Sequence, residues 1–347
     1  MSLPEAKAFS DVEYDYYSRT IMLKNMGVKA QEDLKRASVC LVGLGGLGSP
    51  IALQLASMGV GHLRIVDGDV VEVSNLQRQN LYGMSDIGLA KAEAAAKRLK
   101  DVNPFITVEP IPSLVNELNV RDLVRGMDVV VGALDSMSPR YALNRACVDH
   151  GIPLVHGAAV AYSGNVSTIL PGVTACLECF QGGVNDENLP SCAVVGVHPS
   201  LVGVVGSIMA SEVVRLITGE PELGDRLLFI DFTDLSFETI KLKRVENCLV
   251  CGDGEPDELG FEEVKEICGR EGRRVFVFQP REDLSLKISD YVEKLKNMGY
   301  EVLAQGELGF TFTGPDRVKG SVLSSGVTII EGFNNLGKAR EFHEHIM

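Results

Sequence analysis

The stretch Ser38-Val-Cys-Leu-Val-Gly43-Leu-Gly45-Gly46-Leu-Gly48 decides the fold of this 347-residue chain. Its apolar first half predicts a buried strand, and the apolar, alanine-bearing stretch from Ser49 to Met58 predicts a helix. The glycines between them match GxGxxG, a pattern that lets the backbone turn tightly and approach phosphate at a helix N-terminus. A nucleotide-binding turn is therefore predicted, although the pattern alone does not distinguish NAD from ATP.

The following hundred residues alternate between strand and helix patterns, which predicts a Rossmann-like, mostly parallel α/β sheet with helices on both faces. The expected strands are His62–Asp67, Asp128–Gly132 and Pro153–His156, and the expected helices are Leu89–Val102 and Arg140–His150. The sheet is then expected to continue into an antiparallel part. Its strands are Ser163–Leu170, Leu227–Phe232 and Phe237–Lys243, with an apolar helix at Leu201–Ile217.

Composition changes after Cys251, where residues 252–258 form a charged linker that contains glycine and proline. We predict one large domain over residues 1–252 and a small α/β module of unknown role over residues 258–347. In the module, Phe261, Val264 and Ile267 are expected to share a helix face. The other expected strands are Arg274–Phe278, Glu301–Ala304, Gly309–Thr313 and Val327–Ile330, and further helices carry Tyr291 and Phe342.

Charge and hydropathy exclude several classes of protein. The chain has 33 basic and 47 acidic side chains, a net charge of -14, which argues against a protein that coats nucleic acid or anionic membrane. The apolar run Cys192–Ile217 is interrupted by His198, Pro199 and Glu212, so a buried core helix is expected rather than a membrane span. No signal-peptide pattern is seen at the N-terminus, and a cytoplasmic protein is expected.

The segment after the second strand favours a triphosphate over a dinucleotide. Asp67 ends that strand, where a carboxylate meets ribose hydroxyls. Asp69, Asn75 and Arg78 follow closely, and Lys91 begins the next helix; a triphosphate needs such donors and cations, whereas a dehydrogenase seldom does. Each of these residues taken singly is more often a solvated surface group.

Asp135 follows the strand Asp128–Gly132, at the sheet edge where ligands bind. A carboxylate beside a polyphosphate is repulsive unless it holds a cation, so Asp135 is a candidate Mg²⁺ ligand. The alternative is that Asp135 caps the helix near Arg140, and the two roles are compatible.

Together these motifs resemble the MoeB/ThiF/HesA family, the prokaryotic relatives of ubiquitin-activating enzymes. The resemblance extends from about Tyr16 to Cys251 and is most specific in Asn75-Leu-Gln-Arg78-Gln. It implies an ATP-dependent adenylyltransferase acting on the C-terminal glycine carboxylate of a ubiquitin-like sulfur carrier that ends in Gly-Gly. It also implies a homodimer, because an arginine of the N-terminal helix, here Arg19, reaches into the neighbouring subunit's site.

The resemblance assigns roles residue by residue. The glycine loop (Gly43, Gly45, Gly46, Gly48) and Asp67 and Asp69 bind the nucleotide, Asn75, Arg78 and Lys91 hold the phosphates, and Asp135 coordinates Mg²⁺. Cys192 lies where the family often carries a cysteine that forms a thioester or acyl-persulfide with the carrier. The alternative is a dispensable thiol beside the site, because several relatives stop at the adenylate.

Two CxxC pairs, Cys176/Cys179 and Cys248/Cys251, offer four thiolates for a closed, tetrahedral Zn²⁺ site. Their separation far exceeds the usual finger spacing, so two unrelated pairs of core cysteines remain the alternative. The remaining cysteines Cys40 and Cys147 are expected in the core. Cys268 is expected at a helix end, a context that does not match a sulfurtransferase loop.

Three other functions stay open. The acceptor could be a small-molecule or peptide carboxylate, and the unmatched C-terminal module leaves room for that. An NAD-binding oxidoreductase would leave Asn75 and Arg78 unexplained. A non-catalytic scaffold would leave the joint presence of all the phosphate-handling residues unexplained.

Overall fold

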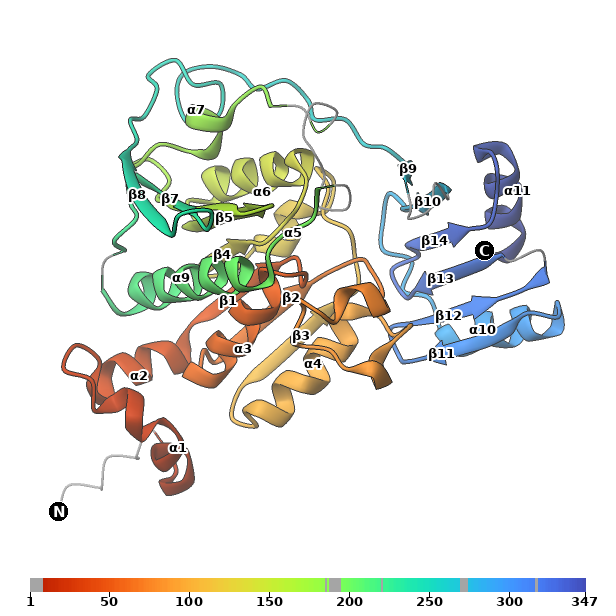
Figure 1. Cartoon of the computed structure of the whole chain (residues 1–347), viewed down its shortest axis with the longest axis horizontal. Helices are drawn as coiled ribbons and strands as arrows, with labels where there is room; N and C mark the ends of the chain where they lie inside the picture. The colour runs from red at the N-terminus through yellow and green to blue at the C-terminus, as the bar shows by residue number, and fades with distance from the viewer. Residues whose placement is uncertain (1–8, 185, 187–194, 220, 269–273, 316–317) are drawn as a thin grey trace.

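The computed structural model describes residues 9–184, 186, 195–219, 221–268, 274–315 and 318–347, with only the backbone at 267 and 268. An eight-stranded sheet with the order β3-β2-β1-β4-β5-β6-β7-β8 lies in its first part (Figure 1). Pairing is parallel from β3 to β5 and antiparallel from β5 to β8. The strands are β1 Ser38–Val42, β2 His62–Val66, β3 Thr107–Ile111, β4 Val129–Gly132, β5 Leu154–Val160, β6 Ser163–Ile169, β7 Arg226–Asp231 and β8 Ser236–Lys241.

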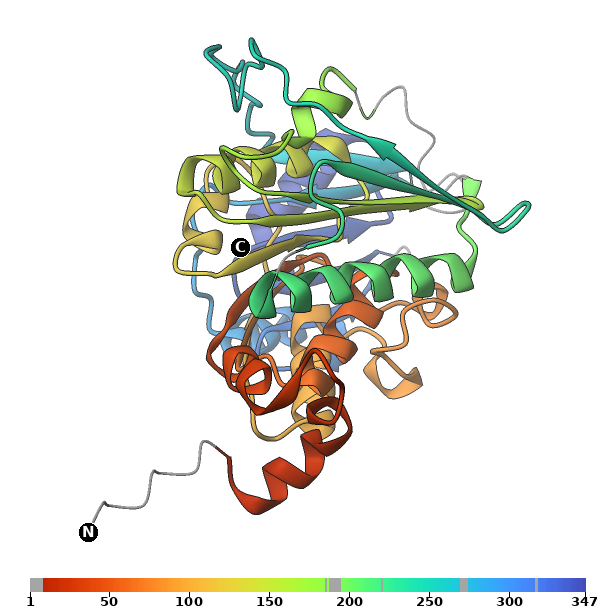
Figure 2. The ribbon, with the colours of Figure 1, turned by 90° about the vertical axis from the view of Figure 1, so that its left-hand side faces the viewer.

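Helices cover both faces of this sheet, as the alternating pattern predicts. In β1, Val39 and Leu41 pack into one apolar cluster while Cys40 and Val42 pack into the other. One face carries α2 Gly27–Arg36, α3 Gly48–Met58, α4 Lys91–Val102 and α9 Pro199–Thr218; the other carries α5 Val120–Val124, α6 Met137–His150 and α7 Leu177–Gln181 (Figure 2). Strands buried on both faces read as continuous apolar runs, which is why β1 and β4 were readily predicted.

The helix α9 is long and apolar enough to cross a membrane by length and composition. In this structure Leu201, Val205, Met209 and Val213 belong to the core beneath the sheet, and all four are buried. The expectation of a core helix at this position is therefore confirmed.

A second, six-stranded antiparallel sheet follows the linker, with the order β11-β12-β13-β14-β10-β9. Its elements are β9 Val264–Cys268, β10 Arg274–Phe278, α10 Ile288–Asn297, β11 Glu301–Gln305, β12 Gly309–Thr313, β13 Lys319–Leu323, β14 Thr328–Glu331 and α11 Leu336–Ile346. An apolar cluster that includes Phe276, Phe310 and Phe312 joins the two helices to this sheet.

The helix expected around Phe261–Ile267 is wrong. Residues 264–268 form β9 instead, which pairs antiparallel with β10, so Cys268 ends a strand rather than a helix. A short apolar run does not by itself distinguish helix from strand, and here pairing with β10 decides the outcome. The strand β13 was also not predicted, because its sequence Lys-Gly-Ser-Val-Leu carries a weak strand signal.

Candidate active site and cysteine cluster

The glycine loop connects β1 to α3, and its glycines serve two different purposes. A Cβ at Gly43 would lie 2.4 Å from the Ala133 carbonyl oxygen, and a Cβ at Gly48 would lie 1.9 Å from the Gly43 carbonyl oxygen. These two positions therefore exclude any side chain by backbone packing. At Gly45 and Gly46 the nearest atoms would be 3.8 Å and 3.4 Å away, so their missing side chains leave room for a ligand to approach the backbone.

Asp67 follows β2 and binds the glycine loop directly. Its Oδ2 accepts a hydrogen bond from the Leu44 N–H at 2.7 Å, and its Oδ1 accepts one from the Asp69 N–H at 2.9 Å. Burial raises the pKa of Asp67 above its ordinary value, although the nearby Lys91 opposes this shift. Each carboxylate oxygen has a second lone pair, so Asp67 can still accept from a ribose hydroxyl.

Lys91 is the buried cation of the site. It begins α4, its side chain is 7% exposed, and its Nζ donates to Asp69 Oδ2 at 2.6 Å. Burial alone would lower the pKa of Lys91, but the carboxylates of Asp69, Asp67 and Asp135 raise it above its ordinary value. Lys91 is therefore charged at neutral pH and lies among three carboxylates.

Asn75 and Arg78 lie on the short helix η1 Val73–Asn75 and just after it. The buried Asn75 accepts the Glu72 N–H at 2.9 Å through its Oδ1, which fixes the start of this turn. Arg78 is half-buried, and its Nη1 donates to the Ser74 carbonyl at 2.9 Å. That bond uses one of five N–H groups of the guanidinium, so the fork can also bind phosphate.

Asp135 is exposed, and it lies close enough to Lys91 to raise the pKa of that residue. The preceding Ala133 is held against β1, because its N–H donates to the Val42 carbonyl at 2.8 Å. The carboxyl ends of β1, β2 and β4 thus meet at one edge, as predicted.

The alternative role of Asp135 as a helix cap is wrong. The N-cap of α6 is Ser136, and the Asp186 carboxylate accepts from the N–H groups of Met137 at 2.6 Å and Ser138 at 3.3 Å. Asp186 comes from the segment after α7, 49 residues after Met137, and no local sequence pattern signals such a contact.

Gln79 is a site residue that the sequence reasoning passed over. Its side chain is buried, its Nε2 is the atom nearest to a Cβ placed at Gly45, and its Oε1 has no hydrogen-bond partner among the described residues. A buried amide oxygen without a partner is costly unless a ligand supplies a donor. Its position in Asn75-Leu-Gln-Arg78-Gln79 was the available signal.

One predicted residue, Arg19, is not brought to this site within its own chain. Arg19 lies exposed in the last turn of α1 Asp11–Ile21. The Tyr16 hydroxyl of that helix donates to the Val102 carbonyl at 2.9 Å, so α1 is fixed at the end of α4 opposite to Lys91 (Figure 1). A 12-residue helix is about 18 Å long, which separates Arg19 from the glycine loop of its own chain. Cys192 lies outside the described residues.

The four cysteines of the two CxxC pairs converge on one point. Their Sγ atoms all lie within 4.8 Å of one another, with Cys176–Cys179 at 3.8 Å, Cys176–Cys248 at 3.7 Å and Cys179–Cys251 at 3.4 Å. Four thiolates at ~2.3 Å from a tetrahedral zinc ion are ~3.8 Å apart, so these separations fit that metal. The two pairs are thus neighbours, and the alternative of two unrelated core pairs is wrong.

Backbone N–H groups favour the thiolate of one cysteine in this cluster, Cys248. Burial would raise the pKa of Cys248, but the N–H groups of Cys251 and Val250 and the adjacent thiols lower it to about 7. Burial and the neighbouring thiols raise the pKa of Cys176. The other free cysteines described, Cys40 and Cys147, are buried in the core as expected.

The sequence profile of the ThiF family matches residues 17–250. The chain belongs to the ThiF family. The SAMP-activating enzyme E1 of Haloferax volcanii is 42% identical over 258 residues, which cover 74% of this chain and 95% of that relative. The sulfur carrier protein adenylyltransferase of Thermus thermophilus is 40% identical over 264 residues, 74% of this chain and 97% of the relative. The structure of Escherichia coli MccB with ATP aligns with a TM-score of 0.63 over 72% of this chain and 77% of MccB at 24% identity, which shows the fold alone.

This ThiF-family protein is an adenylyltransferase of the superfamily that includes the ubiquitin-activating enzymes. The resemblance seen in the sequence is confirmed, ATP is the nucleotide expected for the family, and the oxidoreductase alternative is wrong.

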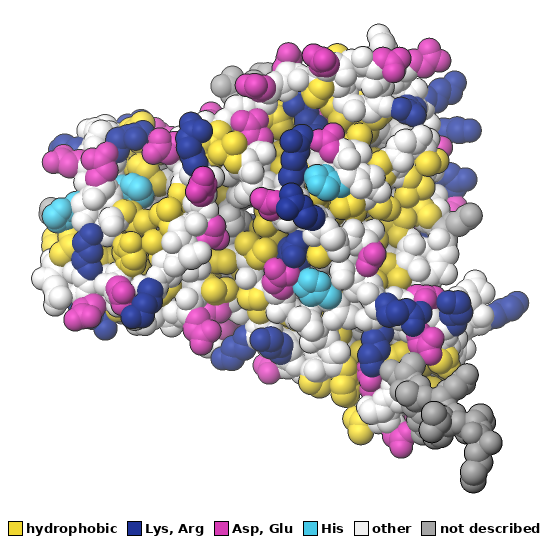
Figure 3. All heavy atoms as spheres, turned by 180° about the vertical axis from the view of Figure 1, so that it is seen from behind, with side chains coloured by type: hydrophobic (Ala, Val, Ile, Leu, Met, Phe, Trp, Pro, Cys, Tyr) yellow, Lys and Arg dark blue, Asp and Glu magenta, His cyan; other side chains and the backbone are white. Residues whose placement is uncertain are grey.

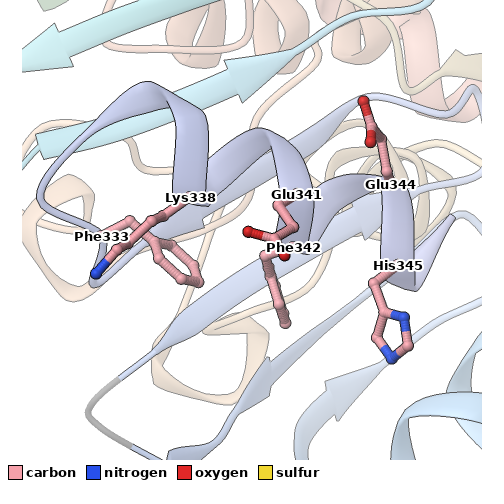
Figure 4. A pocket seen from close by; sticks show the side chains of 6 residues that line it. All are labelled: Phe333, Lys338, Glu341, Phe342, Glu344 and His345. Atoms are coloured by element: carbon pink, nitrogen blue, oxygen red, sulfur yellow. The ribbon is translucent and has the colours of Figure 1, made fainter.

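Elsewhere on the ThiF-family chain, a shallow hollow lies along α11. It is lined by Phe333, Lys338, Glu341, Phe342, Glu344 and His345 (Figure 4). These mixed charges surround two aromatic rings and carry no phosphate-binding pattern. On the face shown in Figure 3, basic and acidic side chains are likewise interspersed.

Proposed function

We propose that the protein adenylates the C-terminal glycine carboxylate of a ubiquitin-like sulfur carrier that ends in Gly-Gly, and releases pyrophosphate. The observation that carries this proposal is the convergence of the glycine loop, Asp67 and the buried Lys91 at the ends of β1, β2 and β4. The sulfur-carrier and SAMP-activating functions of the relatives named above supply the acceptor class.

In this reaction a carboxylate oxygen of the carrier attacks the α-phosphorus of ATP. The new bond joins that oxygen to phosphorus, the bond between the α-phosphorus and the bridging oxygen breaks, and pyrophosphate leaves with the electron pair. No general base is required, because the attacking carboxylate is already ionised at neutral pH. The protein's contribution is to position the reactants and to neutralise the charge that develops on pyrophosphate.

Each site residue has a part in this scheme. Asp67 binds the ribose hydroxyls, and the backbone at Gly45 and Gly46 faces the phosphates. Asn75, Arg78 and Lys91 hold the phosphates, and Asp69 keeps Lys91 in place through the 2.6 Å ion pair. The Gln79 amide oxygen, which has no partner among the described residues, would accept a hydrogen bond from the ligand at the same loop.

The exposed carboxylate of Asp135 would hold Mg²⁺, whose charge shields the triphosphate and the leaving group. A hard oxygen ligand at the edge of a phosphate site, near Lys91, fits that cation.

The four cysteines would hold a structural Zn²⁺. The ion would join the start of α7, after β6, to the chain segment after β8, and so close the end of the adenylation domain, residues 1–252. Residues 258–347 would form a separate module.

We further propose a cytoplasmic homodimer in which Arg19 of one subunit completes the site of the other. Its distance from the site of its own chain favours a role in trans. The Cys192 thiolate would then attack the acyl carbon of the adenylate and form a thioester with the carrier while AMP leaves, or else Cys192 would be a bystander.

Carrier-dependent ATP–pyrophosphate exchange tests the proposal. Wild type and Cys192→Ala should both catalyse exchange, and Arg78→Ala should not. A thioester trapped on a non-reducing gel, lost in Cys192→Ala, assigns the covalent step; its absence makes Cys192 a bystander. No exchange with any Gly-Gly-ended carrier would refute the proposed acceptor, and a peptide or small carboxylate that supports exchange would replace it.

A further inference from the structure

The segment that carries Asp69 and Lys91 is a short two-stranded strip. Val70 and Ala90 form an antiparallel bridge, the Lys91 N–H donates to the Asp69 carbonyl at 2.9 Å, and the Val71 N–H donates to the Leu89 carbonyl at 2.9 Å. Residues 69–71 and 88–91 are called the phosphate strip below. Their pairing places the Lys91 ammonium beside the Asp69 carboxylate, where the site requires it.

The second sheet covers the outer side of this strip. Val70 and Ala90 are buried in one apolar cluster with Val277 of β10, Leu323 of β13 and Val327, which immediately precedes β14. The buried Thr311 of β12 donates from its hydroxyl to the Gly88 carbonyl at 2.7 Å. The second sheet, which begins some 170 residues later in the chain, thus packs against the phosphate strip (Figure 1).

Glu93 forms the most specific contact between the two units. Its Oε1 accepts the Glu307 N–H at 2.8 Å and its Oε2 accepts the Leu308 N–H at 2.9 Å, in the turn between β11 and β12. The fit is close, since a Cβ at Gly306 would lie within 2.5 Å of the carboxylate atoms. Glu93 is two residues after Lys91 in the first turn of α4, so this charged contact acts directly on the helix end that presents Lys91.

The family match ends at residue 250, and the two relatives are aligned over 95% and 97% of their length. Those relatives therefore have little unaligned length that could form such a unit. In this chain the second sheet follows the family match, and it packs on the phosphate strip rather than on a face remote from the site.

We propose that the second sheet positions the phosphate strip, and that its docking and ATP binding are therefore coupled. The coupling is reciprocal: docking holds Lys91 and Asp69 in the arrangement that binds ATP, and bound ATP strengthens the docking contact. Glu93 and Thr311 are positioning residues in this scheme. The inference rests on the proposed nucleotide site.

Binding of a non-hydrolysable ATP analogue with Mg²⁺, measured by calorimetry on the full chain, tests the coupling without a carrier. In Glu93→Ala the dissociation constant should rise about fivefold or more. Glu93→Gln should be intermediate, because its amide oxygen still accepts one N–H, and Thr311→Val should weaken binding as well. Thr313→Val is the matched control: that hydroxyl, on the same strand, donates to the Val318 carbonyl within the second sheet, and its removal should leave affinity unchanged.

Hydrogen exchange supplies the reciprocal measurement. The Glu307 and Leu308 amides should exchange more slowly when the analogue is bound to wild type, and this response should vanish in Glu93→Ala. Unchanged affinity in both Glu93→Ala and Thr311→Val, or exchange indifferent to nucleotide, overturns the coupling, even in an enzyme that adenylates a carrier. If the coupling is seen but no carrier supports pyrophosphate exchange, only the proposed acceptor fails; a wild type that binds no ATP overturns both.

Discussion

Alanine substitutions in the glycine loop should separate the glycines that the fold requires from those that the ligand requires. In Gly48→Ala the new Cβ would lie 1.9 Å from the Gly43 carbonyl oxygen, about 1.1 Å short of the closest approach that real Cβ atoms show. The loop must therefore move by about an ångström. Overpacking of this kind costs ~1–3 kcal/mol of stability, and a displacement of that size in an active site costs ~100-fold in rate.

Gly45→Ala should behave differently. The nearest atom to its Cβ would be Gln79 Nε2 at 3.8 Å, an ordinary contact, so the free energy of unfolding should stay close to that of wild type. The methyl group would instead occupy the space through which phosphate approaches the backbone. ATP affinity should therefore fall at least tenfold, a loss of ~1.4 kcal/mol or more.

Urea unfolding and ATP titration, carried out on both variants, measure the two effects. Gly203→Ala in α9 is the control, because its Cβ meets no atom within 4 Å and alanine favours a helix by up to ~1 kcal/mol. A Gly45→Ala protein that binds ATP as wild type does would refute the nucleotide assignment of the loop. A Gly48→Ala protein with wild-type stability would refute the steric argument.

Four further outcomes are expected. Cys251→Ser should reduce zinc from one equivalent to trace amounts by elemental analysis and lower the melting temperature, whereas a fully loaded variant would contradict the ligand set. Burial and the nearby Arg140 lower the pKa of His156 to about 3 in the folded protein, against ~6.5 in the unfolded chain. Between these two pH values His156 is neutral in the folded protein, whereas the unfolded chain binds a proton at this residue. The free energy of unfolding should thus fall by up to ~1.4 kcal/mol per unit as pH drops from about 6.5 toward 3, and His156→Gln should flatten that slope in acid titrations. Mixing inactive Arg19→Ala and Arg78→Ala chains should restore roughly a quarter of the sites if Arg19 acts in trans within a dimer, and no recovery would contradict it. Asp135→Asn should reduce the dependence of ATP affinity on Mg²⁺, measured with and without chelator; an unchanged dependence would exclude Asp135 as the ligand.

The parts of the site that were predictable are those with strict local chemistry. A glycine at 43 or 48 follows from backbone contacts within a single β–α turn, and Asp67 follows from the end of the next strand. The cysteine cluster was also predictable as a set, although its geometry was not. Two antiparallel reversals place the ends of β6 and β8 at the same edge, so pairs that are far apart in sequence become neighbours.

Contacts between segments that are distant in the sequence could not be predicted from local sequence patterns. Asp186 caps α6 from a distant segment, and Glu93 meets the turn between β11 and β12 more than 200 residues away. Neither residue belongs to a motif, and an acidic residue in the first turn of a helix is ordinary. The misassigned segment at 264–268 has the same cause, because its partner strand decides its conformation.

The charge balance at the site explains how an acidic protein can bind a polyanion. Three carboxylates, Asp67, Asp69 and Asp135, lie near the buried cation Lys91. A second cation of the site, Arg78, is half-buried. Lys91 alone cannot attract a triphosphate, since its ion pair with Asp69 already neutralises it. With Arg78 included, the site has two cations against three carboxylates, so a further cation, such as one that arrives with the nucleotide, would be needed for net attraction. If Asp135 holds Mg²⁺ and Arg19 acts in trans, as proposed, the site would attract anions strongly only after both cations are in place.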